Sequence, residues 1–193
     1  MSESGATVDV FEAIEARRSI KRFMDRPIPR ETIERLLETV VLAPNHRMTQ
    51  PWGFLVLGDE AKRAYGRVLG RRKARRVENA EAARAVAEKV LQETAAVPAV
   101  VAVTMRLDED PEIREEDYAA TYMGIQNMLL AATAMGIGTH VKTGAVMDDP
   151  ELREALAVPS DRRVVALVHL GEAAEVPPPK PRTRAAELTT WLP

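Results

Sequence analysis

The sequence predicts one compact domain that mixes amphipathic helices with short, buried strands. A helical apolar stripe runs over residues 33–41, a continuous apolar run of strand length covers 98–105, and a last strong strand is predicted over 163–170. The chain has 193 residues, of which 46% are hydrophobic, and it contains no long biased segment. A chain of this size can bury a substantial core. We therefore expect a single domain over 1–193, with a C-terminal extension from about 172.

The composition excludes several partners and chemistries. The 27 basic and 29 acidic residues give a formal net charge of −2, so no global field favours nucleic acid or an anionic membrane. The absence of cysteine removes disulfides, thiolate nucleophiles and thiolate metal sites. The N-terminal residues are polar and acidic, and the longest apolar runs are too short to span a bilayer. We expect a soluble, cytoplasmic protein that binds neither nucleic acid nor membrane.

A cationic cluster, Arg17-Arg18-Ser19-Ile20-Lys21-Arg22-Phe23, follows the first predicted helix. Asp9 and Glu12 have the spacing of a capping pair for that helix, which we expect to end near Arg17. The dipole at a helix C-terminus favours cations, and this explanation is preferred on the cluster alone. The alternative is an anion site, in which guanidinium groups, a hydroxyl and an ammonium group converge on one phosphate.

Residues 43–52 form the loop around which we interpret the rest of the chain. Pro44 ends the preceding helix, and Pro29 suits the first turn of that helix. Pro51 breaks regular structure again before a strand predicted over 54–57. Trp52 offers a large ring for burial. The polar side chains between the two prolines are Asn45, His46, Arg47, Thr49 and Gln50. On this stretch alone, a ligand-binding loop and a solvated loop with a hydrophobic anchor are equally good interpretations.

The next region, over 59–94, is polar and mostly helical by composition. It contains the basic run Arg71–Arg76, which no aromatic residue interleaves and which is followed closely by Glu78, Glu81 and Glu88. We interpret this run as a solvated helix face or a mobile lid rather than a nucleic-acid patch.

The clearest helix pattern follows the strand predicted over 98–105. Its apolar positions alternate between spacings of four and three, which is typical of a packing seam. These positions are Tyr118, Tyr122, Ile125, Leu129 and Ala132. Residues 128–135 are apolar nearly all round, so we expect them to be buried inside the domain or against a second subunit.

A glycine-containing segment, residues 136–144, leads into another short strand. It is not the dinucleotide fingerprint, because that pattern needs a third glycine where Val141 stands and follows a strand rather than a helix. Its glycines would let the backbone approach a flat ligand, and Gly136 also fits an ordinary helix cap. Farther on, Asp149 and Pro150 start a helix, and a stiff tail over 177–182 carries Lys180 and Arg182.

The side chains by themselves offer little catalytic chemistry. None of the four serines lies in a Gly-x-Ser-x-Gly elbow, the three histidines lack the spacing of a zinc site, and no nucleotide phosphate loop is present. We interpret His169, inside an apolar strand, as a satisfied core histidine. An enzyme of this composition would need a bound cofactor for the hard chemical step, and the cationic clusters point to a phosphate on that cofactor.

Four segments together resemble the nitroreductase family of FMN-dependent oxidoreductases, in order and spacing over nearly the whole chain. They are Arg17 to Lys21, the Ala43-Pro44-Asn45-His46 and Gln50-Pro51-Trp52 parts of the loop, Gly136 to Gly144, and Lys180 to Arg182. The Asn-His-Arg form of the loop is similar to the small-nitroreductase branch. The resemblance implies an α+β sandwich with a central mixed, mostly antiparallel sheet flanked by helices. It also implies an intertwined homodimer with FMN at the subunit interface.

By position, the resemblance also implies a set of FMN contacts. Arg17, Arg18 and Ser19 would contact the phosphate or ribityl chain, and Arg182 would be a second phosphate ligand. The fixed cations nearer the ring would stabilise negative charge on the reduced flavin. The remaining implied residues are Lys21 and Lys142 near the ring, His46 and Gln50 from the same or the partner subunit, and Gly138 and Thr139 beside the isoalloxazine, with Thr143 and Gly144 as further cofactor contacts.

The implied activity is a ping-pong cycle in which NADH or NADPH reduces FMN and a nitroaromatic, quinone or similar acceptor is then reduced. No catalytic acid or base needs to be named, because the flavin carries the chemistry. Val141 stands where many relatives carry a bulky Trp, so the pocket is wider or stacked differently. Two alternatives remain: a flavin dehydrogenase or dehalogenase of the same fold, and a flavin-binding module without turnover.

Overall fold

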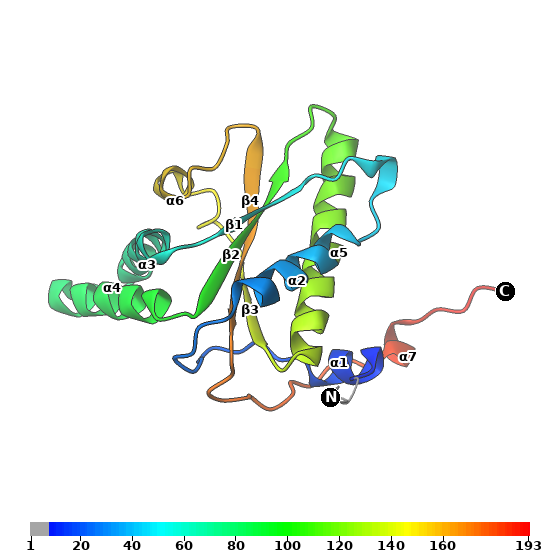
Figure 1. Cartoon of the computed structure of the whole chain (residues 1–193), viewed down its shortest axis with the longest axis horizontal. Helices are drawn as coiled ribbons and strands as arrows, with labels where there is room; N and C mark the ends of the chain where they lie inside the picture. The colour runs from blue at the N-terminus through cyan, green and yellow to red at the C-terminus, as the bar shows by residue number, and fades with distance from the viewer. Residues whose placement is uncertain (1–7) are drawn as a thin grey trace.

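A four-stranded antiparallel sheet forms the centre of the computed structural model, which describes residues 8–193. The strand order is β1-β2-β4-β3, and helices cover both faces of the sheet (Figure 1). Within 8–193, the parallel pairing is the isolated bridge between Ser19 and Thr139. The strands are β1 (Trp52–Val56), β2 (Ala99–Arg106), β3 (Gly138–Lys142) and β4 (Arg162–Gly171). This arrangement confirms the α+β sandwich that the family resemblance implies.

The helices begin where the sequence offers caps. Asp9 caps the first helix in a full capping box with Glu12, and Asp149 caps a later helix that has Pro150 in its first turn. Pro29 lies at the N-cap of its helix, one position before the first turn. The helices are α1 (Val10–Ala16), α2 (Arg30–Val41), the 3₁₀ turn η1 (His46–Met48), α3 (Asp59–Ala74), α4 (Ala80–Ala95), α5 (Pro111–Ala134), α6 (Pro150–Ala155) and α7 (Ala185–Leu188).

One face of the sheet packs against α2 and α5. Leu36 and Val40 of α2 and Met128 of α5 are fully buried against strand residues such as Val101 and Val103. Gly124 of α5 lies under α2, where a Cβ would come within 2.8 Å of the Val40 carbonyl oxygen. The two helices therefore cross closely, and the apolar stripe predicted for 33–41 is confirmed.

The other face packs against α3 and α6. Tyr65 and Val68 of α3 and Leu152 of α6 are completely buried there. His169 of β4 lies on this face with its ring edge-on to Tyr65, at 5.8 Å between ring centroids. His169 is buried as predicted, but its Nε2 atom and the Tyr65 hydroxyl have no hydrogen-bond partner. The expectation that this histidine is satisfied was wrong for that atom, because its neighbours on this face are mainly apolar.

Helix α5 runs the length of the sheet, and its buried stripe differs from the predicted seam. Ile125, Leu129 and Ala132 are buried as predicted, but Tyr118 is 37% exposed and Tyr122 is only half-buried. The buried positions in the N-terminal half are instead Asp117, Ala120 and Thr121. The stripe turns inward there because the 45–50 loop covers it. In the half over 128–135, Met128, Leu129 and Ala132 are buried within the chain itself.

The C-terminus of α5 has the geometry of a Schellman motif. Gly136 adopts a φ of 72°, its N–H donates to the Thr133 carbonyl, and the Ile137 N–H donates to the Ala132 carbonyl at 2.8 Å. Glycine accepts this left-handed conformation without a Cβ penalty. The cap turns the chain directly into β3, as the glycine-containing segment predicts.

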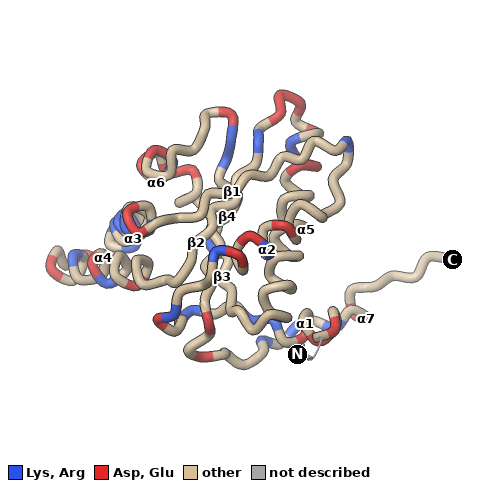
Figure 2. The backbone as a smooth tube through the Cα atoms, viewed as in Figure 1, with Lys and Arg blue, Asp and Glu red and all other residues tan. Residues whose placement is uncertain are grey.

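The basic run Arg71–Arg76 lies at the end of α3 and just beyond it (Figure 2). Arg71 forms an ion pair with Glu151, and Arg72 approaches Asp149 with its Nη1 atom at 3.5 Å from Oδ2. Both acceptors belong to α6 and its cap, so the start of the run ties two helices together. The structure therefore favours the helix face over the mobile lid. No helix over 8–193 combines the length and apolarity needed to cross a membrane.

Candidate functional site

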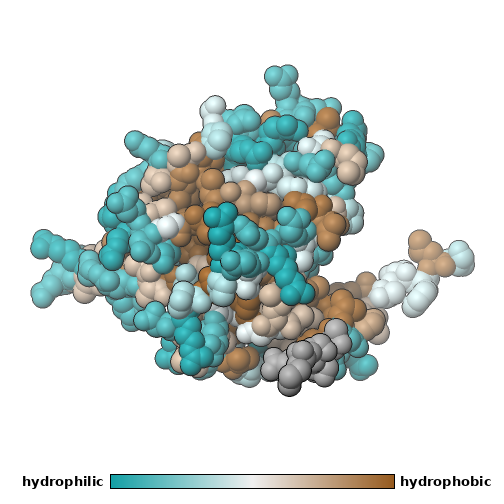
Figure 3. Space-filling view, in the orientation of Figure 1, coloured by the Kyte–Doolittle hydropathy of each residue, from teal (hydrophilic) through white to brown (hydrophobic). Residues whose placement is uncertain are grey.

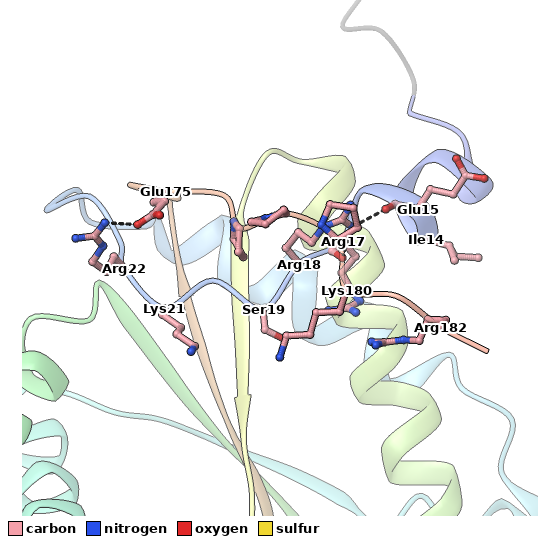
Figure 4. Close-up of a pocket in the computed structure, with 13 residues that line it drawn as sticks. Ile14, Glu15, Arg17, Arg18, Ser19, Lys21, Arg22, Glu175, Lys180 and Arg182 are labelled. Carbon is pink, nitrogen blue, oxygen red and sulfur yellow. Dashed lines mark hydrogen bonds and ion pairs between the residues drawn. The ribbon is translucent and has the colours of Figure 1, made fainter. Parts of the chain in front are cut away.

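A cavity of about 810 Å³ lies between α1 and the C-terminal tail (Figure 4). Four of the predicted site residues from the first cationic cluster line it, and Arg182 of the tail lies across from them. The lining residues are Ile14, Glu15, Arg17, Arg18, Ser19, Lys21, Arg22, Glu175, Pro177, Pro178, Pro179, Lys180 and Arg182. Two segments more than 150 residues apart in sequence thus bring six cations to one cavity with only two carboxylates.

Backbone pairing holds the two walls of the cavity in place. The Ile20 N–H donates to the Thr139 carbonyl at 2.8 Å, which fixes the cationic segment beside β3. Farther along, Phe23 pairs with Ala173, and Arg22 forms an ion pair with Glu175. The tail is therefore fastened to the first cluster on one side of the cavity, and its prolines keep the following segment extended.

The cations of this cavity are mostly left without acidic partners. Arg17, Lys21 and Lys180 form no ion pair within residues 8–193. Arg18 donates to the Glu15 carbonyl at 2.6 Å and to the Arg17 carbonyl at 3.0 Å, so it closes the end of α1. Like charges in one cavity repel, and a bound anion that accepts charge-assisted hydrogen bonds relieves that repulsion. The helix-end explanation of the cluster holds for Arg18, and the anion-site explanation fits Arg17 and Lys21, whereas Arg22 is already paired with Glu175.

A second, smaller cavity of about 130 Å³ adjoins the first and contains Gly138 and Thr139. Arg18 lines both cavities. A Cβ at Gly138 would lie 2.7 Å from Ile20 Cγ1 and 3.1 Å from the Gly171 carbonyl oxygen. Only glycine allows the cationic segment, β3 and β4 to approach this closely, so packing within the protein accounts for Gly138, and the predicted approach of this backbone to a flat ligand stays a prediction.

The end of β3 presents the next group of predicted residues. Lys142 is half-buried, whereas Thr143 and Gly144 are exposed, and Gly144 adopts a φ of 98°. Burial lowers the pKa of Lys142, and the charges of Lys73 and Lys21 lower it further. The charge of Lys21 therefore acts on Lys142, and Lys73 from the end of α3 is a third cation of this group.

His140 and His169 form a cross-strand pair beside these lysines. Their ring centroids are 6.2 Å apart. Burial, together with Lys142 and Lys21, lowers the pKa of His140 to about 4. Burial, together with Lys142 and His140, lowers the pKa of His169 to about 3. Both rings are therefore neutral near neutral pH.

His46 and Gln50 lie on the 45–50 loop, at the opposite end of α5 from the cavity (Figure 1). The His46 Nδ1 atom lies 2.8 Å from Glu116 Oε1, and this hydrogen bond, with the charge of nearby Arg47, lowers the pKa of Glu116. About 20 residues of α5 and its cap separate this loop contact from the cavity, which corresponds to roughly 30 Å of helix. Within one chain, the structure does not bring His46 and Gln50 to the predicted phosphate site.

Sequence reasoning missed several residues of the cavity. Arg22 was part of the recognised cluster, but its partner Glu175 lies 153 positions away, which no local pattern reveals. Lys180 belongs to the cation-bearing tail and lines the cavity with Arg182, yet it was not among the predicted contacts. Outside the cavity, Lys73, whose charge acts on Lys142, was also missed, because nothing distinguishes it from its neighbours in the basic run.

Comparison with known proteins decides the family. The sequence profile of the Nitroreductase family matches residues 14–172. The chain belongs to the Nitroreductase family. It is 33% identical over 182 residues to YfhC of Bacillus subtilis (strain 168), whose name assigns it to the NAD(P)H nitroreductases, and the match covers 89% of this chain and 88% of YfhC.

Solved nitroreductase structures share the fold. A nitroreductase-like family protein from Bacillus cereus superposes with a TM-score of 0.83 at 26% identity, covering 100% of this chain and 98% of that protein. A Desulfovibrio desulfuricans nitroreductase in complex with FMN superposes with a TM-score of 0.72 at 25% identity, covering 95% and 96% of the two chains. The family resemblance read from the four segments is thereby confirmed.

The residues of the larger cavity fit the chemistry of an FMN phosphate. Guanidinium and ammonium groups without acidic partners, and the exposed hydroxyl-bearing Ser19, are the donors that a phosphomonoester accepts from. The backbone around Gly138 lines the adjoining smaller cavity, and Lys142 lies at the end of the same strand, so both suit a flat, electron-accepting ring. This nitroreductase-family chain therefore has a donor set that can hold FMN.

Proposed function

We propose that this chain is an FMN-dependent NAD(P)H oxidoreductase that reduces nitroaromatic, quinone or similar acceptors. The observation that carries the proposal is the cavity between α1 and the tail, which Arg17, Lys21 and Arg182 line together in a Nitroreductase-family fold. The chain works as one FMN-binding unit, and its C-terminal extension over 172–193 supplies part of the cavity wall.

Bound FMN would supply hydride transfer between NAD(P)H and the acceptor in a ping-pong cycle. Arg17, Arg18, Ser19 and Arg182 bind the phosphate and ribityl end. Lys21 and Lys142 place positive charge beside the ring, where it stabilises the charge that develops on reduction. The tight packing at Gly138 fixes the backbone of Thr139, which would lie next to the ring of bound FMN.

We propose that the working unit is a homodimer in which one subunit supplies the phosphate cradle and its partner supplies the 45–50 loop. The roughly 30 Å of helix between the two groups is longer than one FMN molecule, so a single chain cannot use both groups on the same flavin. A two-fold dimer brings the loop of each subunit to the cavity of the other. His46 and Gln50 then line the flavin pocket from the partner side.

Exposed apolar side chains support the dimer. Phe11 on α1 is 72% exposed, and Trp191 in the tail, which projects from the body, is 90% exposed (Figure 3). At the loop end, Leu42 is 78% and Met48 is 70% exposed. Large exposed apolar side chains at these two places are available for a protein–protein contact. A second copy of the chain would cover both groups at once.

The test of function is the visible absorbance of protein that has been incubated with FMN and desalted, before and after anaerobic addition of NADH or NADPH. Retained flavin that loses its absorbance with one donor supports the oxidoreductase and identifies that donor. Retention without loss of absorbance would instead support a binding module. Absence of retention would refute FMN dependence, and a narrow product profile would favour a specialised dehydrogenase or dehalogenase.

The dimer is tested by light scattering coupled to size-exclusion chromatography. The full chain should have twice the monomer mass, and a variant ending at Arg184 should shift towards the monomer, because it lacks Leu188 and Trp191. A monomeric full chain that nevertheless binds FMN tightly would contradict the shared site.

A further inference from the structure

We propose that Asp117 of α5 is a positioning residue, which holds the 45–50 loop in a strained conformation so that His46 and Gln50 face the flavin pocket. Because the role is defined by flavin binding, it rests on the proposed function. Asp117 does not itself place a charge in the flavin pocket. It acts through Thr49 and Asn45, which lie between it and the backbone of the loop.

The loop backbone is unusual for its residue types. Arg47, Met48 and Gln50 have φ values of 64°, 51° and 46°, in the left-handed region that favours glycine. Three such residues within four positions persist only where the surroundings determine the conformation, and strain of this kind clusters at binding sites. Something in the structure must therefore hold this loop.

A hydrogen-bonded chain from the helix to the loop does so. The Gln50 N–H donates to Asn45 Oδ1 at 2.6 Å, and Asn45 Nδ2 donates to Thr49 Oγ1 at 3.1 Å. The Thr49 hydroxyl then donates to Asp117 Oδ1, and Asn45 Nδ2 also lies 3.4 Å from the same oxygen. Because a carboxylate only accepts, the Thr49 hydroxyl donates to Asp117 and accepts from Asn45 Nδ2, although it also lies 3.2 Å from Asn45 Oδ1. The backbone of Gln50 is thus linked to α5 through two side chains.

Burial makes Asp117 the controlling member. It is only 3% exposed, whereas Arg47 pairs with Glu112 at the surface, and its second partner, Glu116, has a side chain that is 30% exposed. A buried carboxylate that loses its donors is costly, so the network strongly favours the loop conformation that supplies them. Exposed ion pairs contribute little by comparison. The buried network, rather than the surface charges, therefore selects the strained conformation.

Residue Thr49 offers a matched pair of variants. Thr49→Val keeps the shape of the side chain but removes the hydroxyl, and Thr49→Ser keeps the hydroxyl. Thr121→Val is the control for stability, because Thr121 is fully buried on the same helix and donates to the Asp117 carbonyl without touching the loop. All three variants are made in the full chain.

The first measurement is the rate of trypsin cleavage after Arg47, followed by mass spectrometry, on protein without added flavin. Thr49→Val should speed cleavage about tenfold, as expected for the loss of one partner of a buried charge, while Thr49→Ser and Thr121→Val should match wild type. Equal cleavage of Thr49→Val and wild type would overturn the positioning role. This measurement does not depend on FMN binding, so it remains decisive if the proposed function fails.

The second measurement is FMN affinity by fluorescence quenching, with the visible spectrum of the bound flavin. Thr49→Val should weaken FMN binding about tenfold and shift the bound spectrum towards that of free FMN, and Thr49→Ser should restore both. Unchanged affinity and spectrum in Thr49→Val, with faster cleavage at Arg47, would overturn the claim that the loop faces the flavin. The same loss in Thr121→Val would also overturn it, since a general destabilisation would then explain the effect.

Discussion

The cavity end and the loop end of the candidate site use charge in opposite ways. In the cavity, Arg17, Lys21 and Lys180 have no acidic partners within residues 8–193, so their charge is available to a ligand. In the loop, Arg47 pairs with Glu112 and Glu116, and His46 also contacts Glu116. The loop therefore offers position rather than charge, and its strained backbone shows how firmly that position is held. A binding site can thus be recognised by uncompensated charge in one segment and by enforced geometry in another.

The largest expected effect comes from removing cations of the cavity. The double variant Arg17→Ala/Arg182→Ala should weaken FMN binding by about a hundredfold or more, because each lost charge-assisted hydrogen bond contributes about 1.5–3 kcal/mol. Calorimetric titration with FMN measures the change. Thermal stability should be nearly unchanged, since neither side chain forms an ion pair in the described chain.

The matched control for that variant is Arg75→Ala, which removes an exposed arginine just beyond α3. It should leave FMN affinity within experimental error. Equal weakening by Arg75→Ala would mean that the total charge of the protein, and not the cavity, attracts the anion.

The next effect concerns the backbone that joins the cavity to the sheet. Gly138→Ala should lower the free energy of unfolding by about 1–3 kcal/mol, because the new Cβ overlaps Ile20 and the Gly171 carbonyl. Urea denaturation of the apoprotein measures this. Gly58→Ser serves as the control: Gly58 is an N-cap with open space around its Cβ position, so its stability should be equal or slightly higher. Wild-type stability of Gly138→Ala would show that Ile20 moves aside freely.

The third effect concerns His169, on the buried face of β3 and β4, rather than the cavity or the loop. The folded pKa of His169, about 3, lies below its ordinary value of 6.5, so the unfolded chain binds the extra proton between these pH values. Stability is therefore complete above about pH 6.5 and falls as the pH decreases, by about 1.4 kcal/mol per pH unit for this group. The prediction is best checked between pH 6.5 and 5, above the range in which most carboxylates titrate.

His169→Phe, which keeps a ring beside Tyr65 but cannot bind a proton, should flatten this slope in urea titrations at several pH values. The remaining slope would come from His140, which is only half-buried. An unchanged slope in His169→Phe would mean that His169 binds its proton equally well in the folded and the unfolded chain, which would contradict the lowered pKa.

The smallest expected effect comes from removing a surface charge that pairs with the loop. Glu112→Gln removes one exposed partner of Arg47 and should change the free energy of unfolding by less than about 0.5 kcal/mol. Trypsin cleavage after Arg47 should also remain close to the wild-type rate, because the buried Asp117 network stays intact. Cleavage as fast as that expected for Thr49→Val would transfer the positioning role from the buried network to the surface charges.

Features that depend on a few neighbouring residues could be predicted from the sequence. The Asp9–Glu12 capping box, the start of a helix at Pro150 and the glycine cap at Gly136 are all confirmed, because each involves atoms within about one helical turn. Strand ends were less accurate. The first strand begins at Trp52 rather than Phe54, because its pairing with Met105 extends it, and that partner lies more than 50 residues away.

The sequence by itself therefore determined the local elements, the cationic cluster at Arg17 to Lys21 and the family to which four registered segments point. Only the tertiary structure decided that Arg182 faces this cluster, that Glu175 pairs with Arg22, and that Asp117 fixes the loop. It also decided that His46 lies at the far end of α5 from the cavity. The physical reason is range: caps and apolar periodicity act over a few residues, whereas these contacts form only when packing brings distant segments together.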